Sequence, residues 1–187
     1  MKSLEDFVMV RPGAIPADLC QTLVETYKNS DEWFAGEIGE GTVKLERRNC
    51  SVLYLDNANI VLSEDRIRHI NSLRSFIGEG IRIYRNQVSS YFMPEFDEGL
   101  SMLRYNEGDY YREHVDCANG TRTMSVIMNL SEADAYEGGD FQITGMDPIH
   151  LGQGDMVFFP SQFQWPHQIH SITSGTRYSV VTWLTSG

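Results

Sequence analysis

The spacing of apolar residues predicts helices in the first half of the chain. Five apolar side chains recur at intervals that line one face of a helix: Leu19, Cys20, Leu23, Val24 and Tyr27. Proline is favoured in the first turn of a helix, where its missing N–H has no intrahelical partner, so this helix is expected to begin near Pro16. The pattern therefore predicts a first helix from about residue 16 to residue 27.

A second, longer helix is predicted over residues 65–86. Its apolar residues fall on one side: Ile67, Ile70, Leu73, Phe76, Ile77, Ile81 and Tyr84. Gly78 and Gly80 weaken this prediction, because each costs about 1 kcal/mol relative to alanine inside a helix. Five arginines are spread over the rest of the surface, which we interpret as a solvated face rather than an anion-binding patch: Arg66, Arg68, Arg74, Arg82 and Arg85.

A glycine- and glutamate-rich segment over residues 36–48 separates the two predicted helices. It predicts a loop that leads into a short strand over residues 50–55. A loop of this length is either a mobile lid or an excursion over the surface, and the sequence leaves both open.

The second half of the chain has the pattern of β-structure. Short apolar runs are separated by turn signals such as Glu137-Gly138-Gly139-Asp140, and the predicted strands cover residues 123–130, 141–144, 156–159, 167–173 and 177–184. Many short strands at even spacing are typical of a sandwich or jelly roll. We expect one mainly β domain of the α+β class over residues 1–187. Residues 1–100 would supply helices packed on one outer face and the first strands, and residues 101–187 a jelly-roll (double-stranded β-helix) core.

The charge balance narrows the range of partners. The 187 residues include 26 acidic and 15 basic side chains, a formal net charge of -11. This charge repels phosphate backbones and anionic headgroups, so nucleic-acid and membrane-surface binding are disfavoured. The sequence has no apolar run near the roughly 20 residues of a membrane-spanning helix, and its start resembles no secretory signal, so a cytoplasmic location is expected. Three widely spaced cysteines predict reduced thiols rather than a disulfide framework.

Histidine and aspartate supply the first candidate metal ligands. In an extended segment, His114 and Asp116 point to the same side because they are two residues apart. A second imidazole, from His167 or His170, would complete the two-histidine, one-carboxylate set that binds Fe(II) and leaves coordination positions open. Geometry alone leaves both of these histidines as candidates. The remaining two, His69 and His150, are interpreted as packing or surface residues.

Arg177 is the second candidate. It is the only Lys or Arg from residue 123 to the end of the chain, and the two-residue period places it on one strand face with Ser179, Val181 and Trp183. That face is apolar enough to be interior, and a buried guanidinium requires an anion. The anion could be Asp140 or Asp155, but the two-pronged donor is also suited to a ligand carboxylate, which we favour.

Together these residues resemble the Fe(II)- and 2-oxoglutarate-dependent oxygenases of the prolyl-hydroxylase-like superfamily. The resemblance runs from about Arg104 to Trp183 and rests on order, spacing and residue type. Its parts are Tyr105-x-x-Gly108-x-x-Tyr111-x-x-His114-x-Asp116, Arg122 at the start of a strand, Leu130-Ser131, Tyr136-x-Gly138-Gly139-x-Phe141, Gly154-Asp155, Phe159-Pro160-Ser161 and His167-x-Ile169-x-x-Ile172-x-x-Gly175-x-Arg177.

The resemblance implies a role for each candidate. His114, Asp116 and His167 would ligate Fe(II), because the family places its distal histidine ten residues before the arginine that binds 2-oxoglutarate, here Arg177. Tyr105 is similar to the tyrosine that reaches this co-substrate. The other implied positions line the substrate pocket: Tyr111, Arg122 and Trp183. For Tyr111 and Trp183 ordinary core packing is an equal alternative. The implied co-substrates are 2-oxoglutarate and O2, with ascorbate as a candidate reductant.

The substrate is less well defined than the reaction. Animal prolyl hydroxylases carry Tyr-Leu-Asn where this chain has Asn129-Leu130-Ser131, a form that is more similar to the bacterial and phage branch. We expect hydroxylation of a prolyl residue in a peptide or protein. The alternatives are a free amino acid or small metabolite, a non-catalytic metal- or sugar-binding jelly roll, and nucleic-acid demethylation, which the charge opposes. The sequence does not define an oligomeric state.

Overall fold

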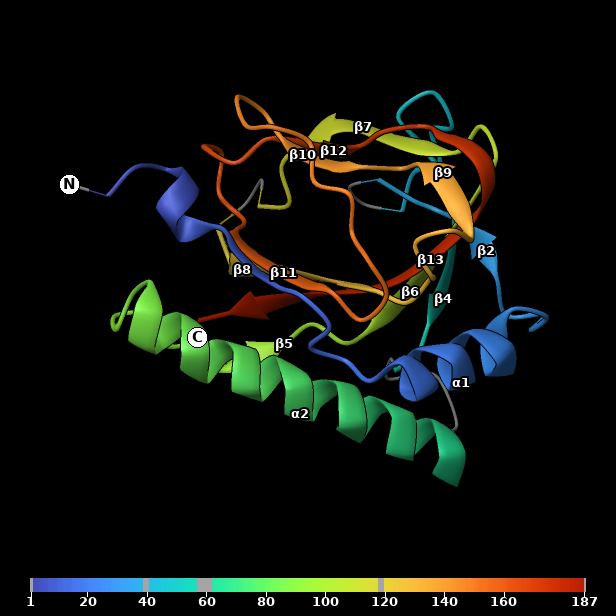
Figure 1. The fold of residues 1–187 in the computed structure, drawn as a ribbon, viewed down its shortest axis with the longest axis horizontal. Helices are drawn as coiled ribbons and strands as arrows, with labels where there is room; N and C mark the ends of the chain where they lie inside the picture. Colours follow the sequence, from blue (N-terminus) through green and yellow to red (C-terminus); the bar gives the residue numbers. More distant parts are fainter. Residues whose placement is uncertain (1, 39–40, 57–61, 118–119, 187) are drawn as a thin grey trace.

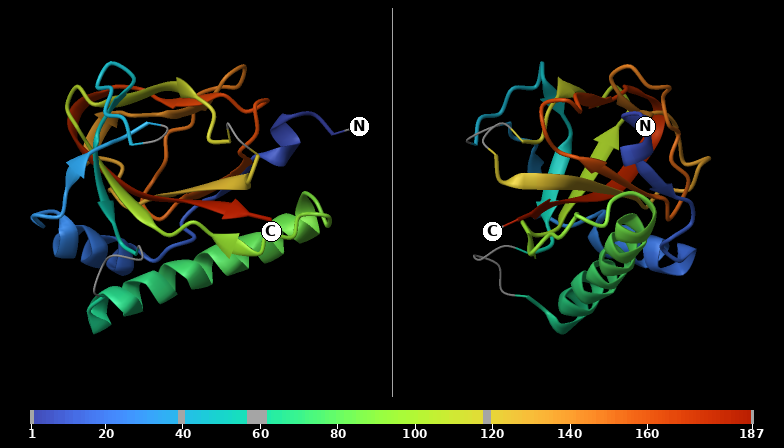
Figure 2. Two further views of the ribbon diagram at one scale, coloured as in Figure 1. Left: turned by 180° about the vertical axis from the view of Figure 1, so that it is seen from behind. Right: turned by 90° about the vertical axis from the view of Figure 1, so that its left-hand side faces the viewer.

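The computed structural model describes residues 2–38, 41–56, 62–117 and 120–186. Two antiparallel sheets face each other, and both helices lie against the outer face of the larger sheet (Figure 1). A view from the side shows the same arrangement, with the long helix beneath the sheets (Figure 2). The predicted class, mainly β with flanking helices around a jelly-roll core, is confirmed.

The larger sheet has nine strands within the described ranges. Its order is β1 (Met9–Arg11), β11 (Met156–Pro160), β8 (Arg122–Asn129), β13 (Ile172–Thr185), β6 (Ser101–Asn106), β4 (Ser51–Tyr54) and β2 (Phe34–Ala35), while β5 (Phe96–Asp97) and β9 (Tyr136–Gly138) pair with β13. The smaller sheet has the order β10 (Phe141–Ile143), β12 (His167–Ile169), β7 (Tyr110–His114) and β3 (Arg48–Asn49). A short 3-10 helix covers Glu5–Phe7.

Both predicted helices are present, as α1 (Ala17–Tyr27) and α2 (Glu64–Gln87). Pro16 precedes the first helix, and the side chain of Ser63 caps the second by accepting a hydrogen bond from the Arg66 backbone N–H. For two side chains of α2, the predicted burial is wrong. Ile67 is 42% exposed, whereas Arg66 is buried and its guanidinium is 2.5 Å from a Glu32 carboxylate oxygen. Arg66 is one turn before Ile70, on the side that faces the sheet, and the ion pair offsets its desolvation.

Alternation along the strands separates two apolar clusters. Met124, Val126 and Met128 of β8 face the helices, whereas Ile127 of the same strand packs between the two sheets. The same period in β13 sends Val180 toward the helices and Val181 between the sheets. Polar side chains in the inward-facing register therefore lie between the sheets, where the candidate site is found.

Gly80 explains how α2 approaches the larger sheet. A Cβ atom at this position would lie 2.1 Å from Cζ of the buried Phe158 ring, whereas a Cβ at Gly78 would meet no atom within 4 Å. We expect Gly80→Ala to reduce the free energy of unfolding by about 1–3 kcal/mol through overpacking. The matched Gly78→Ala change should increase it by about 0.5–1 kcal/mol through helix propensity. Urea unfolding of both variants checks this, and equal effects would contradict the packing explanation.

Three further expectations concern the predicted loop, the cysteines and membrane-spanning helices. Within the predicted loop over residues 36–48, residues 39 and 40 lie outside the described part of the chain, and Arg48 already belongs to β3. Cys20, Cys50 and Cys117 are all buried free thiols. In the ranges given above, no helix has the length and apolarity needed to cross a membrane.

Candidate active site

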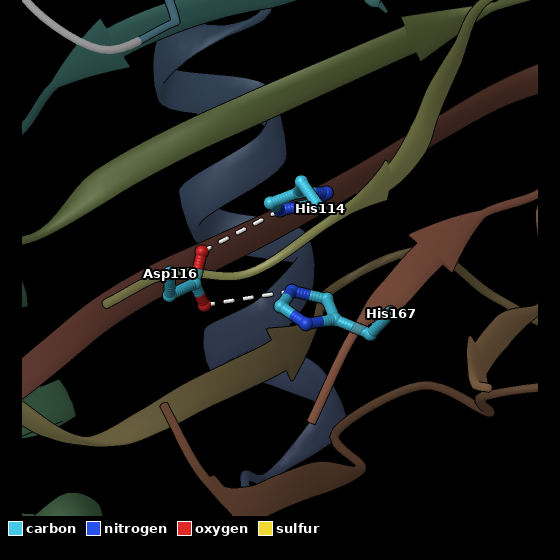
Figure 3. A group of neighbouring side chains, drawn as sticks. All are labelled: His114, Asp116 and His167. Atoms are coloured by element: carbon cyan, nitrogen blue, oxygen red, sulfur yellow. Dashed lines mark ion pairs between the residues drawn. The ribbon is translucent and has the colours of Figure 1, made fainter. Parts of the chain in front are cut away.

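Three side chains converge between the two sheets. His114 ends β7, His167 begins β12, and these two residues are paired directly across the smaller sheet. Asp116 follows two residues after β7. Its Oδ1 is 3.4 Å from His114 Nε2 and its Oδ2 is 3.5 Å from His167 Nε2 (Figure 3). The three donor atoms lie within 4.8 Å of one another, and no other group of this kind occurs among the described residues.

Backbone carbonyls determine which imidazole nitrogen faces the site. His114 Nδ1 is 2.9 Å from the Arg112 carbonyl oxygen, and His167 Nδ1 is 3.0 Å from that of Trp165. A carbonyl only accepts, so each Nδ1 carries a proton and donates it, which leaves Nε2 as the ring nitrogen that faces Asp116. This second hydrogen bond is what metal-ligating histidines require. Burial lowers the pKa of His167 to about 4, although the Asp116 carboxylate opposes the shift, so this ring is neutral near pH 7.

Asp116 is held from the opposite sheet. The Ser125 hydroxyl of β8 donates to Asp116 Oδ2 at 2.6 Å, and Ser125 Oγ is 2.8 Å from Ser161 Oγ. Both serines are buried. Burial alone would raise the pKa of Asp116, but the His167 and His114 rings and the Ser125 hydroxyl hold it well below its usual value. Two imidazoles and one carboxylate that line a cavity fit a divalent iron ion.

Removal of the Ser125 hydroxyl should loosen the Asp116 carboxylate. We expect Ser125→Ala to weaken metal affinity by about 10- to 100-fold, the usual cost of losing an outer-shell partner. Titration of the metal-free protein with Fe(II) under anaerobic conditions, or with Mn(II), measures this. Ser179→Ala is the control, because Ser179 is equally buried but makes no contact with Asp116 among the described residues. Equal affinity in native and Ser125→Ala proteins would contradict the prediction.

Arg177 lies in the same cavity, on β13. It is 1% exposed, its Nε donates to Asn129 Oδ1 at 3.1 Å, and its Nη2 has no hydrogen-bond partner among the described residues. Neither carboxylate considered above pairs with it: Asp140 contacts His150, and Asp155 accepts from backbone N–H groups. A buried guanidinium with an unsatisfied Nη2 fits an anionic ligand, because a carboxylate would accept the hydrogen bond that the protein leaves open.

Two tyrosines of the resemblance line this cavity. Tyr105 is directly opposite Arg177 in the register of β6 and β13, and the Arg177 guanidinium carbon is 5.8 Å from its ring centroid. Burial raises the pKa of Tyr105 well above its usual value, so its hydroxyl stays protonated as a donor. The Tyr111 ring stacks on His114 with centroids 3.5 Å apart. Both residues line the cavity, and they also belong to or pack against the apolar cluster between the sheets.

Arg122 and Trp183 form one edge of the site. The Arg122 guanidinium carbon is 3.8 Å from the Trp183 ring centroid, and its Nη2 is 2.7 Å from a Glu98 carboxylate oxygen. Arg122 Nη1 also donates to the backbone carbonyl of Asp116 at 3.2 Å. Trp183 lines the cavity, while Arg122 lies behind it and is not among the lining residues.

Several residues lie outside the cluster. His170 Nε2 is 2.8 Å from Gln142 Oε1, away from the three donors. His69 Nδ1 is 3.1 Å from the Tyr27 hydroxyl, in agreement with its interpretation as a packing residue.

The sequence analysis did not identify Ser125 and Asn129, which hydrogen-bond to Asp116 and Arg177 respectively. The signal available for both was a polar residue in the otherwise apolar strand Met124-Ser-Val-Ile-Met-Asn129.

Comparisons with known proteins agree with this geometry. The model of the 2OG-Fe(II) oxygenase superfamily matches residues 100–185. A PKHD-type hydroxylase of Idiomarina loihiensis is 33% identical over 105 residues, which cover 53% of this chain and 47% of that protein. A PKHD-type hydroxylase of a Synechococcus species is 29% identical over 177 residues, covering 89% and 73% respectively. The chain thus spans about half the length of the first relative.

Solved structures share the fold. A Trichoplax adhaerens prolyl hydroxylase, in complex with a hypoxia-inducible factor peptide fragment, superposes with a TM-score of 0.80 at 16% identity, covering 96% of this chain and 84% of that one. A Pseudomonas putida prolyl-4-hydroxylase gives a TM-score of 0.71 at 20% identity, covering 96% and 93%.

The fold and the His–Asp–His cluster define a jelly-roll protein with a two-histidine, one-carboxylate site, and solved prolyl hydroxylases share this fold. The range matched by the family model, residues 100–185, contains all three donors and Arg177. Residues 100–185 match the 2OG-Fe(II) oxygenase superfamily, and the curated relatives described above are PKHD-type hydroxylases.

Proposed function

We propose that this protein is an Fe(II)- and 2-oxoglutarate-dependent dioxygenase that hydroxylates an unactivated C–H bond, with a prolyl residue of a peptide or protein as the leading substrate. One observation carries the proposal. Three metal-donor side chains line the same cavity as a buried guanidinium that has no anionic partner among the described residues, so that a metal ion and a dicarboxylate can be held side by side. Iron bound there would supply oxygen activation coupled to conversion of 2-oxoglutarate into succinate and carbon dioxide.

Different residues of the chain would bind the metal, bind the co-substrate and line the space for the substrate. His114, Asp116 and His167 would hold the metal through two Nε2 atoms and one carboxylate. Arg177 would pair with the far carboxylate of 2-oxoglutarate, and the Tyr105 hydroxyl would donate to the same co-substrate. Trp183 and Tyr111 would bound the space for the molecule that is hydroxylated, here called the prime substrate. Arg122 would keep Trp183 and the Asp116 backbone in place.

Succinate formation tests the proposal. The native protein should release succinate from 2-oxoglutarate only when Fe(II) and oxygen are supplied, and a prime substrate from peptide and amino-acid libraries should gain 16 Da, the mass of one oxygen atom, as general hydroxylation chemistry requires. Ascorbate should increase the number of turnovers if it acts as the reductant. A native protein that neither binds 2-oxoglutarate nor forms succinate with any divalent metal would refute the proposal and favour a non-catalytic jelly roll.

The peptide substrate draws support from the neighbours of this chain. The Trichoplax protein of the same fold was solved with a peptide fragment, and the Pseudomonas protein is a prolyl-4-hydroxylase. One observation favours the alternative of a free amino acid or small metabolite: a second guanidinium, that of Arg48, also lines the cavity. The same libraries separate the two substrate classes by the molecule that gains the oxygen.

A further inference from the structure

The Tyr111 ring lies between Arg48 and the proposed metal ligand His114. It belongs to β3 and is paired in register with Tyr111 of β7. The Arg48 guanidinium carbon is 4.8 Å from the Tyr111 ring centroid, and that ring stacks on His114. Arg48 and Arg177 line the same cavity, and Tyr105 also lines it. The sequence analysis assigned no role to Arg48, and the proposed function gives it no ligand of its own.

Local contacts fix the direction of the Arg48 side chain. Its Nη1 donates to the Glu37 carbonyl oxygen at 2.8 Å, and its Nε is 3.3 Å from Cys50 Sγ. Gly36 makes room for it, because a Cβ atom there would lie 2.9 Å from both Arg48 Nε and Cys50 Sγ. The guanidinium is therefore positioned before any ligand arrives, which reduces the entropy cost of binding.

None of these partners carries a compensating negative charge. Among the described residues, no carboxylate oxygen lies within 4.0 Å of the Arg48 guanidinium, whereas Arg66, Arg74 and Arg122 each pair with an acidic side chain. Of the described arginines that have no acidic side chain within this distance, only Arg48 and Arg177 line the cavity. A partly buried cation without an anion is a binding group for one, because pairing recovers the cost of its desolvation.

We infer that Arg48 binds a carboxylate of the prime substrate. The inference rests on the proposed function, in which Arg177 takes the far carboxylate of 2-oxoglutarate and leaves the second guanidinium for the molecule that is hydroxylated. The shared chemistry is a carboxylate next to the reacting carbon. It can come from a free amino acid or other small acid, or from an acidic side chain or chain end of a peptide.

Matched acid and amide pairs test this inference. The small-molecule arm compares each L-amino acid, proline included, with its primary amide. The peptide arm compares amidated prolyl peptides that differ by Glu or Gln beside the proline. Dissociation constants are measured on protein loaded with Mn(II) and 2-oxoglutarate without oxygen, and succinate formation is measured with Fe(II). The acid of at least one pair should bind about tenfold more tightly than its amide, and the arm in which it does so identifies the source.

Variants of Arg48 connect that preference to the guanidinium. Arg48→Gln should abolish the difference between acid and amide and leave 2-oxoglutarate affinity little changed, while Arg48→Lys should retain part of it. Arg104→Gln is the matched control. Arg104 makes the same kinds of contact, with its guanidinium carbon 4.7 Å from the Trp33 ring and its Nη1 3.3 Å from the Lys28 carbonyl oxygen, but it does not line the cavity. It should keep the native preference.

Three results would overturn the inference. The first is that no acid in either arm binds more tightly than its amide, which includes the case in which no compound binds. The second is that Arg48→Gln keeps the native preference. The third is that Arg48→Gln loses 2-oxoglutarate affinity as strongly as a variant of Arg177, which would place Arg48 in the co-substrate site. Each differs from failure of the proposed function, in which the native protein shows neither 2-oxoglutarate binding nor succinate formation.

Discussion

Replacement of His167 by alanine should remove iron and succinate formation together, whereas the His170→Ala variant should keep both. His167 Nε2 is 3.5 Å from Asp116 Oδ2 inside the cavity, and His170 Nε2 contacts Gln142 outside the cluster of donors. Loss of a direct ligand should weaken iron binding by more than the roughly 10- to 100-fold that follows loss of an outer-shell partner. Iron content after anaerobic reconstitution and succinate release measure the two effects.

The two variants control for each other. Both remove an imidazole from the segment that runs along the smaller sheet, and His167 is the more deeply buried of the two, so thermal unfolding of the metal-free forms is measured alongside. A variant that folds and still lacks iron has lost a ligand rather than its structure. If His167→Ala retained iron, or His170→Ala lost it, the assignment of His167 as the second imidazole ligand would be wrong.

Replacement of Arg177 by lysine should weaken 2-oxoglutarate binding by about 10- to 100-fold, the cost of hydrogen bonds to a charged group, and leave metal affinity unchanged. A lysine keeps the positive charge but loses the two-pronged donor, whose Nε reaches Asn129 and whose Nη2 has no partner among the described residues. Arg177 does not touch any of the three metal donors, so the two affinities should separate. Calorimetric titration of the Mn(II)-loaded protein with 2-oxoglutarate measures the first.

Arg177→Met is the stronger form of the same test. It removes the charge and the donors while keeping a long side chain of similar shape, so 2-oxoglutarate affinity should fall further than in the lysine variant. The metal titration of each variant serves as the internal control. Unchanged 2-oxoglutarate affinity in both would show that the guanidinium faces the cavity without binding the co-substrate.

Much of the fold could be predicted from sequence because its elements are strongly periodic. The 3.6-residue period of α2 and the two-residue period of β13 define their buried faces, and the face shared by Arg177, Ser179, Val181 and Trp183 does line the cavity. The errors on α2 have a physical cause. Periodicity counts Arg66 as polar, but a partner distant in sequence, Glu32, allows it to be buried, while Ile67 lies at the exposed margin of the apolar stripe.

The candidate site was predictable where residue type restricts the chemistry. Few residue types ligate iron, so His114, Asp116 and His167 could be selected and then combined through the family pattern. The supporting contacts were not predictable. Ser125 holds Asp116 across 9 positions of sequence, and Ser161 extends that contact across 36 more. Serine and arginine have many roles in proteins, so only the assembled sheets reveal which of these side chains serve the cavity.

The placement of Asp116 has a consequence for the stability of the whole molecule. Its carboxylate is hydrogen-bonded to β8 of the larger sheet, while the two imidazoles belong to β7 and β12 of the smaller one. A bound ion would therefore cross-link the two layers at the centre of the barrel. Loading with metal should raise the unfolding temperature, by an amount that grows with the concentration of free ion. Removal of the ion by a chelator should lower the unfolding temperature again.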